Sequence, residues 1–96
     1  MPKYILSPAA QISLKNIKKY TLKNFGQRQT TTYLKKLNER MKLLAAQPSQ
    51  GKERSEIKAG YYSYFVGSHT IYYRISDTHI DIIDILRQSM EPTLHI

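Results

Sequence analysis

Cysteine is absent from the 96 residues, so disulfides and thiolate metal sites are excluded. No apolar run approaches the roughly 20 residues that a membrane-spanning helix needs. The start of the chain, Met1 to Leu6, is too short and too soon broken by Pro2 and Lys3 to be a signal peptide. From these absences we expect a cytoplasmic protein that makes no contact with a membrane.

Acidic residues are scarce in the first half of the chain. Between Pro8 and Ala46 the only acid is Glu39. The basic residues of the same stretch are Lys15, Lys18, Lys19, Lys23, Arg28, Lys35, Lys36, Arg40 and Lys42. This segment therefore carries the whole formal net charge of +8. Such a field attracts nucleic acid or an acidic protein, although a solvated surface that keeps the chain soluble has the same composition.

Motifs for metals and nucleotides are missing as well. No pair of histidines or carboxylates has a familiar ligand spacing, and Asp81 and Asp84 lie three residues apart on a predicted strand, where they face opposite sides. No glycine-rich loop of the phosphate-binding kind is present. We therefore expect neither a metal site nor a cofactor.

The three histidines do not form an acid–base pair. His79 lies beside a predicted turn, where we expect it to be solvated. His69 follows Gly67-Ser68, and we expect it to hydrogen-bond that turn. His95 is next to the last residue, in a region where disorder is common. Cleavage of RNA needs a base and a proton donor together, so the sequence favours binding without catalysis.

The first half predicts one strand and two helices. Lys3 to Leu6 is typical of a short strand, and Ser7-Pro8 is typical of a helix start because serine caps and proline fits the first turn. Phe25-Gly26 marks the end of this helix, and a second helix is expected from about Gln27. The apolar stripe of the second helix is Leu34, Leu37, Met41, Leu44 and Ala45. Together they predict a helical hairpin.

The second half predicts three strands, at 61–66, 70–75 and 79–86, separated by turns at 67–68 and 76–78. The last strand is apolar on both faces, so we expect both to be covered. A hairpin covers only one face, which leaves the other for a partner. The expected fold is a single α+β domain over 1–96: an N-terminal strand, a two-helix hairpin and a three-stranded antiparallel meander, with the helices packed on one face.

The same order of elements is found in the ParE/RelE toxin superfamily, and the chain resembles the ParE branch most closely in its second half. ParE-like chains tend to show a glycine-aromatic stretch, then Gly-Ser-His, then Ile-x-Tyr-Arg, then an isoleucine-rich strand followed by methionine. The matching residues are Gly60-Tyr61, Tyr64, Gly67-Ser68-His69, Ile71, Tyr73-Arg74, Ile82-Ile83, Ile85-Leu86 and Met90. One position departs from the pattern, because Arg87 stands where histidine is usual.

The resemblance implies a toxin of a type II toxin–antitoxin system that inhibits DNA gyrase and blocks replication without catalysis. It also implies a ParD-like antitoxin, whose acidic and partly disordered C-terminal segment wraps the toxin, and contact with DNA only indirectly. The alternative is a RelE-type ribosome-dependent mRNA endonuclease. The missing acid–base pair favours the first of these two functions.

Two groups of residues are the candidate binding sites. We predict that the basic hairpin receives the antitoxin through Lys19, Tyr20, Lys23, Tyr33, Lys36 and Arg40. The resemblance places the toxic surface on the segment after the last strand. There we predict that Arg74 and Arg87 form a cationic patch that contacts the target, with Met90 and the tail up to Ile96 shaping the surface.

Overall fold

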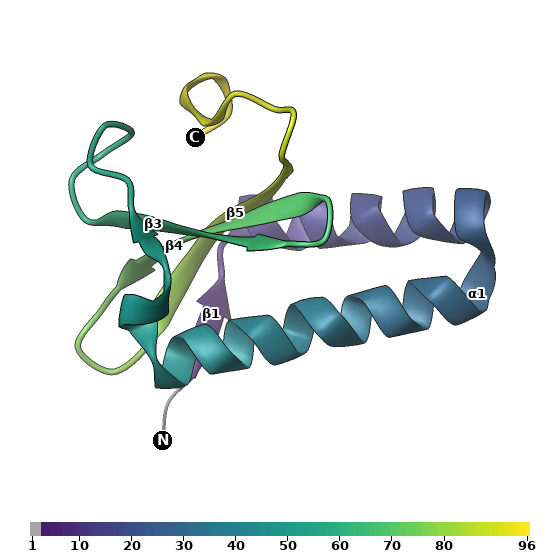
Figure 1. Ribbon diagram of the computed structural model, residues 1–96, viewed down its shortest axis with the longest axis horizontal. Helices are drawn as coiled ribbons and strands as arrows, with labels where there is room; N and C mark the ends of the chain where they lie inside the picture. The colour runs from purple at the N-terminus through teal and green to yellow at the C-terminus, as the bar shows by residue number, and fades with distance from the viewer. Residues whose placement is uncertain (1–2) are drawn as a thin grey trace.

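One long helical element and a five-stranded sheet make up the computed structural model, which describes residues 3–96 (Figure 1). The order of elements is β1 (Tyr4–Leu6), α1 (Pro8–Ala46), η1 (Pro48–Gln50), β2 (Lys52–Glu53), β3 (Tyr61–Val66), β4 (His69–Ile75), β5 (Ile80–Arg87) and η2 (Pro92–Leu94). The strand order in the sheet is β1-β5-β4-β3-β2.

The helix α1 begins where the sequence provides a cap. The Ser7 hydroxyl accepts a hydrogen bond from the Ala10 N–H at 3.0 Å and donates one to the Ile83 carbonyl at 2.6 Å. The cap therefore also ties the start of α1 to strand β5. Among residues 3–96 no helix is long and apolar enough to cross a membrane.

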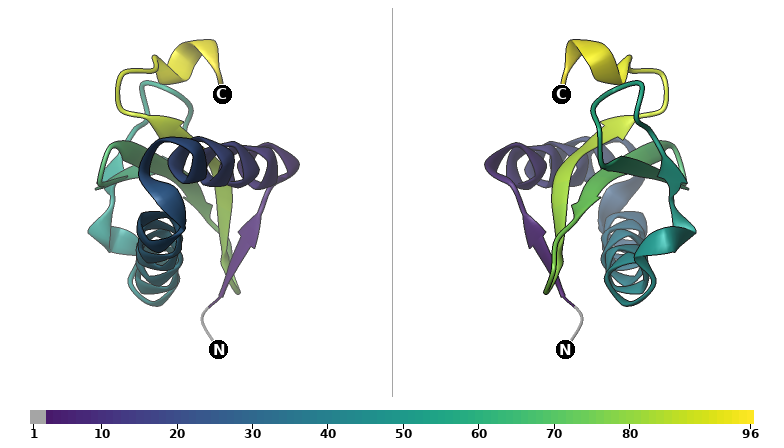
Figure 2. Two further views of the ribbon diagram at one scale, coloured as in Figure 1. Left: turned by 90° about the vertical axis from the view of Figure 1, so that its right-hand side faces the viewer. Right: turned by 90° about the vertical axis from the view of Figure 1, so that its left-hand side faces the viewer.

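The prediction of two separate helices is wrong, because α1 is one helical element with a sharp bend at Gly26. The bend has φ 86° and ψ 172° at Gly26, a backbone conformation open essentially to glycine alone. Helical hydrogen bonding resumes at once, and the Thr30 hydroxyl donates to the Gly26 carbonyl at 2.8 Å. No loop residues separate the two arms, which fold back from the bend and diverge from it (Figures 1 and 2).

The predicted three-stranded antiparallel meander is also wrong: its three segments are present as β3, β4 and β5, but within a five-stranded mixed sheet. Strand β1 pairs in parallel with β5, with Tyr4 opposite Ile80. A parallel neighbour needs a long connection, and here it runs through α1, η1 and the strands β2, β3 and β4 before it reaches β5. Strand β2 pairs with β3 through only two residues, both of them exposed. Because these residues show no alternation of apolar and polar side chains, the sequence did not predict this strand.

The core lies between α1 and one face of the sheet. Both arms of α1 contribute to it, through Ala10, Ile17, Leu37, Met41 and Leu44. The sheet contributes Val66, Ile71, Tyr73, Ile80, Ile82 and Ile85. Tyr73 is fully buried, and its hydroxyl donates to the Pro48 carbonyl and accepts from the Gly51 N–H. These two bonds attach the η1 turn, which follows α1, to the middle of the sheet.

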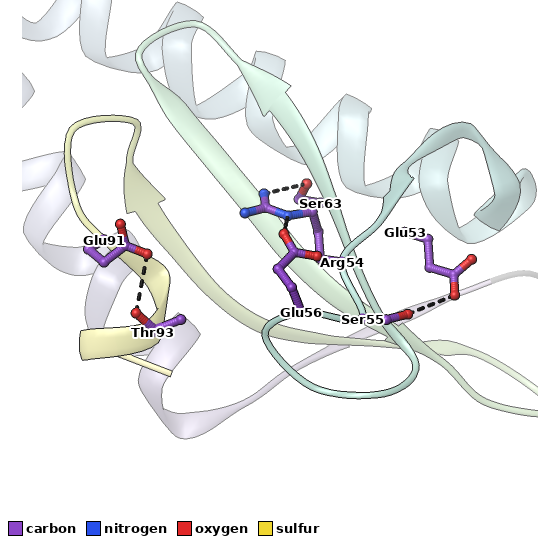
Figure 3. A network of polar contacts seen from close by, with 7 residues as sticks. All are labelled: Glu53, Arg54, Ser55, Glu56, Ser63, Glu91 and Thr93. Carbon is purple, nitrogen blue, oxygen red and sulfur yellow. Dashed lines mark hydrogen bonds and ion pairs between the residues drawn. The ribbon is translucent and has the colours of Figure 1, made fainter.

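The opposite face of the sheet is covered in part by the chain itself. Tyr72 is only 4% exposed, and the Arg54 guanidinium lies 5.9 Å from its ring centroid. Arg54 also donates to the Ser63 hydroxyl at 3.2 Å and pairs with Glu56 at 2.6 Å (Figure 3). At Tyr72 of β4 this face is therefore covered by the segment after β2. That a partner covers the second face of β5 stays a prediction.

Candidate functional site

Two hollows meet along the junction of α1 with β4 and β5, and we call them together the hairpin groove. The larger has a volume of about 610 Å³ and is lined by residues that include Tyr20, Phe25, Arg28, Tyr33, Lys36 and His69. The smaller, of about 360 Å³, is lined by residues that include Ile17, Tyr20, His69, Ile85, Arg87 and Met90. Because both hollows share Tyr20 and His69, they form one continuous surface.

Tyr33 and His69 close the floor of the groove. The Tyr33 hydroxyl lies 2.6 Å from His69 Nδ1 and 3.2 Å from the Val66 carbonyl, to which it donates. The turn between β3 and β4 allows this contact because Gly67 has φ 57° and a Cβ there would lie 2.7 Å from the Tyr33 ring. Glycine at this position therefore serves both the backbone conformation and the close approach of Tyr33.

Arg87 closes the other end of the groove by stacking on α1. Its guanidinium carbon lies 4.8 Å from the centroid of the Tyr20 ring, within the range of a cation–π contact. On the sheet it is the cross-strand partner of His69. Among the described residues no carboxylate lies within 4.0 Å of Arg87. Within the part of the chain that the structure describes, its guanidinium therefore contacts an aromatic ring and has no ion-pair partner.

The lining of the groove is basic and aromatic. Its charged side chains are Arg28, Lys36 and Arg87, and neither aspartate nor glutamate belongs to the lining of either hollow. Asp84 lies behind it, buried, where it accepts from the Ser13 hydroxyl and the Ile85 N–H. A surface with this chemistry suits a ligand that combines carboxylates with apolar groups.

His69 gives the groove a measurable pH response. Burial, and then the charge of Arg87, hold the pKa of His69 below its ordinary value. As pH falls below about 6.5, the unfolded chain binds a proton that the folded His69 resists, so we expect the free energy of unfolding to fall until the pH reaches the folded pKa. An NMR titration of the imidazole should show the low pKa, and Arg87→Ala should raise it. An unshifted pKa in both proteins would contradict this prediction.

The structure brings together residues from both predicted sites. Tyr20, Tyr33 and Lys36, predicted to bind the antitoxin, line the same groove as Arg87 and Met90, predicted to bind the target. The two surfaces that the sequence suggested as separate are thus neighbours at Tyr20.

The remaining predicted antitoxin residues lie outside the groove. Lys19, Lys23 and Arg40 are exposed and belong to neither hollow. Lys19 is about 200° around the helix from the buried Ile17, since each residue turns about 100°. It therefore points away from the core.

Arg74 and Arg87 do not form a joint patch. Arg74 pairs across the strands with Asp81 and lies 3.7 Å from its carboxylate, whereas Arg87 pairs with His69 at the other end of β4. His69, the partner of Arg87, lies five residues from Arg74 along β4, which corresponds to about 17 Å. Arg74 and His69 also face opposite sides of β4, because side chains alternate along a strand. A role of Arg74 in target binding remains a prediction that does not depend on Arg87.

Phe25 and Arg28 are two of the groove residues that the sequence did not indicate as site residues. In the sequence, Phe25 indicated the end of a helix, and Arg28 was one of the basic residues of the positively charged segment. Both flank the bend at Gly26, and Phe25 is 58% exposed. A large aromatic residue beside the glycine that ends a helix is the sequence feature that could have indicated Phe25 as a binding residue.

A second histidine, His79, lies far from the groove. His79 is not free in solvent as expected, because its Nε2 lies 2.9 Å from an Asp81 oxygen at the β4–β5 turn. That turn is at the other end of the strand pair from His69. Within residues 3–96 no three or more His, Asp or Glu side chains are placed to hold a metal ion.

Comparison with known proteins identifies the family. The family described as "ParE toxin of type II toxin-antitoxin system, parDE" matches residues 4–92. Toxin ParE1 of Mycobacterium tuberculosis (strain ATCC 25618 / H37Rv) is 38% identical over 90 residues, covering 93% of this chain and 92% of that protein. Toxin ParE1 of Caulobacter vibrioides is 31% identical over 96 residues, covering 100% and 99%.

Solved structures show the same fold. A chain of the "Chromosomal ParDE TA system from P. aeruginosa" superposes with a TM-score of 0.77 at 19% identity, covering 91% of this chain and 96% of that one. A chain of the toxin–antitoxin complex RelBE2 from Mycobacterium tuberculosis gives a TM-score of 0.59 at 20% identity, covering 92% and 100%. The resemblance predicted from the sequence is thus confirmed, and the chain belongs to the ParE toxin family of type II toxin–antitoxin systems.

Proposed function

We propose that this chain inhibits DNA gyrase and so blocks replication, that it does so in the cytoplasm without catalysing a reaction itself, and that a ParD-like antitoxin neutralises it. The observation that carries the proposal is the match to the ParE family over residues 4–92. Contact with DNA is then indirect, through gyrase or through the antitoxin.

The geometry of the groove supports an inhibitor rather than an enzyme. His69 is the one imidazole of the groove lining, and it is only 9% exposed, with Nδ1 occupied by Tyr33. General acid–base cleavage of RNA needs two proton-transferring groups within reach of the substrate. His79 lies at the far end of the strands, so it does not pair with His69 as a second imidazole.

The same groove supports binding of an acidic antitoxin segment. Apolar side chains of the segment would contact Tyr20, Phe25 and Tyr33, and its carboxylates would approach Arg28 and Lys36. Lys19, Lys23 and Arg40 lie outside the groove, where their charge would act mainly on the rate of association. A segment that is disordered alone and folds on binding can cover such an extended surface.

The test compares the two candidate toxic activities side by side. Purified protein should inhibit supercoiling by gyrase in a concentration-dependent way, and should leave messenger RNA intact on stalled ribosomes. The second activity is tested because the chain shares its fold with a chain of the RelBE2 complex, although their sequence identity of 20% is too low to indicate a shared function. Cleavage of ribosome-bound message without any effect on gyrase would replace the proposal by the endonuclease alternative.

A further inference from the structure

We propose that Arg87 binds a carboxylate of the antitoxin segment, so that one residue serves both the antitoxin-binding and the target-binding surfaces. The inference rests on the proposed function, because it requires an antitoxin and a target. Tyr20 acts as a positioning residue for Arg87. Neutralisation then follows from direct occupation of Arg87.

The stacking geometry leaves the hydrogen-bonding edge of Arg87 open. A guanidinium that lies on an aromatic ring, here 4.8 Å from the Tyr20 centroid, uses its face for that contact. Its five N–H donors lie in the plane and form a fork that matches a carboxylate. Tyr20 thus orders the arginine before a partner arrives, which lowers the entropy lost on binding.

Within residues 3–96 no carboxylate of the chain binds these donors. The acidic residues nearest to Arg87 in the sequence are Asp84 and Glu91. Asp84 is buried and accepts from Ser13 and from the Ile85 N–H, while Glu91 accepts from the Thr93 hydroxyl at 3.2 Å. Neither lies within 4.0 Å of Arg87. A carboxylate therefore has to come from another molecule.

The surroundings of Arg87 also define the kind of side chain that lies beside the carboxylate. The hollow of about 360 Å³ beside it is lined by Ile17, Ile85 and Met90 as well as by Tyr20. An apolar side chain fits this hollow while a neighbouring acid reaches the guanidinium. The partner is thus an acidic, amphipathic peptide segment. A phosphate would satisfy the fork alone but would leave the apolar wall unused.

The experiment measures the affinity of the full-length cognate antitoxin for the purified toxin by calorimetry. Arg87→Ala should raise the Kd at least tenfold, and Arg87→Lys should lie between Ala and wild type because lysine keeps the charge but loses the fork. Tyr20→Ala should raise the Kd several-fold, whereas Tyr20→Phe, which keeps the ring, should bind like wild type. Lys52→Ala on β2 is the matched control, since it removes one positive charge outside the groove.

Each outcome decides the matter. A Kd for Arg87→Ala within twofold of wild type, or a loss equal to that of Lys52→Ala, would overturn the inference. Circular dichroism and thermal unfolding check that each variant is folded. Should Arg87→Ala unfold, Arg87→Lys carries the test: a Kd raised above that of wild type and of Lys52→Ala supports the inference, and an unchanged Kd overturns it. If the wild-type chain does not bind the antitoxin at all, the proposed function fails instead.

Discussion

A chain that ends at Glu91 is expected to lose at least about tenfold of its potency against gyrase. The deletion removes Leu94, an apolar side chain that is 79% exposed at the end of the molecule and so available to a target. Burying a leucine side chain is worth about 1.5–3 kcal/mol, and about 1.4 kcal/mol corresponds to a tenfold change in binding. The measurement is the toxin concentration that halves supercoiling by purified gyrase.

A point variant separates the exposed residue from the stability of the tail. Pro92 is buried, so the truncation also removes packing, whereas Leu94→Ser keeps the η2 turn and Pro92 in place. Both proteins should bind the antitoxin within about threefold of wild type, because Leu94 lines neither hollow of the hairpin groove. Full potency of both proteins would show that the target surface does not include the tail.

Replacing Tyr73 by phenylalanine is expected to lower the free energy of unfolding by about 2–3 kcal/mol. The Tyr73 hydroxyl donates to the Pro48 carbonyl and accepts from the Gly51 N–H, and both groups would lose their partner on the covered side of the sheet. Burial raises the pKa of Tyr73, which keeps the hydroxyl protonated and able to donate. Urea denaturation of the variant and of the wild type gives the difference.

Tyr64→Phe is the matched control. Tyr64 lies on the adjacent strand β3, half-buried against the same core, and its hydroxyl has no hydrogen bond within the described residues. The change should alter the free energy of unfolding by less than about 0.5 kcal/mol. Equal losses in the two variants would mean that the bonds to Pro48 and Gly51 contribute nothing.

Local chemistry was predictable from the sequence wherever its cause lies within a few residues. Ser7 and Pro8 start a helix because the cap and the fixed φ of proline act on the next turn. Gly26 interrupts the helix because essentially only glycine adopts its backbone angles. The sequence did not show that helical hydrogen bonding resumes directly after Gly26, which makes α1 one element and not two helices. The family was likewise predictable, since its motifs are read in order along the chain.

The tertiary structure alone decided how distant segments meet. The parallel pairing of β1 with β5, and the shift of register between Tyr72 and Tyr73, depend on strands far apart in the sequence. In that register Arg87 lies opposite His69, where it contacts Tyr20. Arg74 lies at the other end of β4 and on its other face. The sequence by itself determined the positive charge, the start of α1 at Ser7-Pro8 and four of the five strand segments, all but β2. Which cations share a surface followed only from strand pairing, because a single residue of register turns a side chain to the opposite face of a sheet.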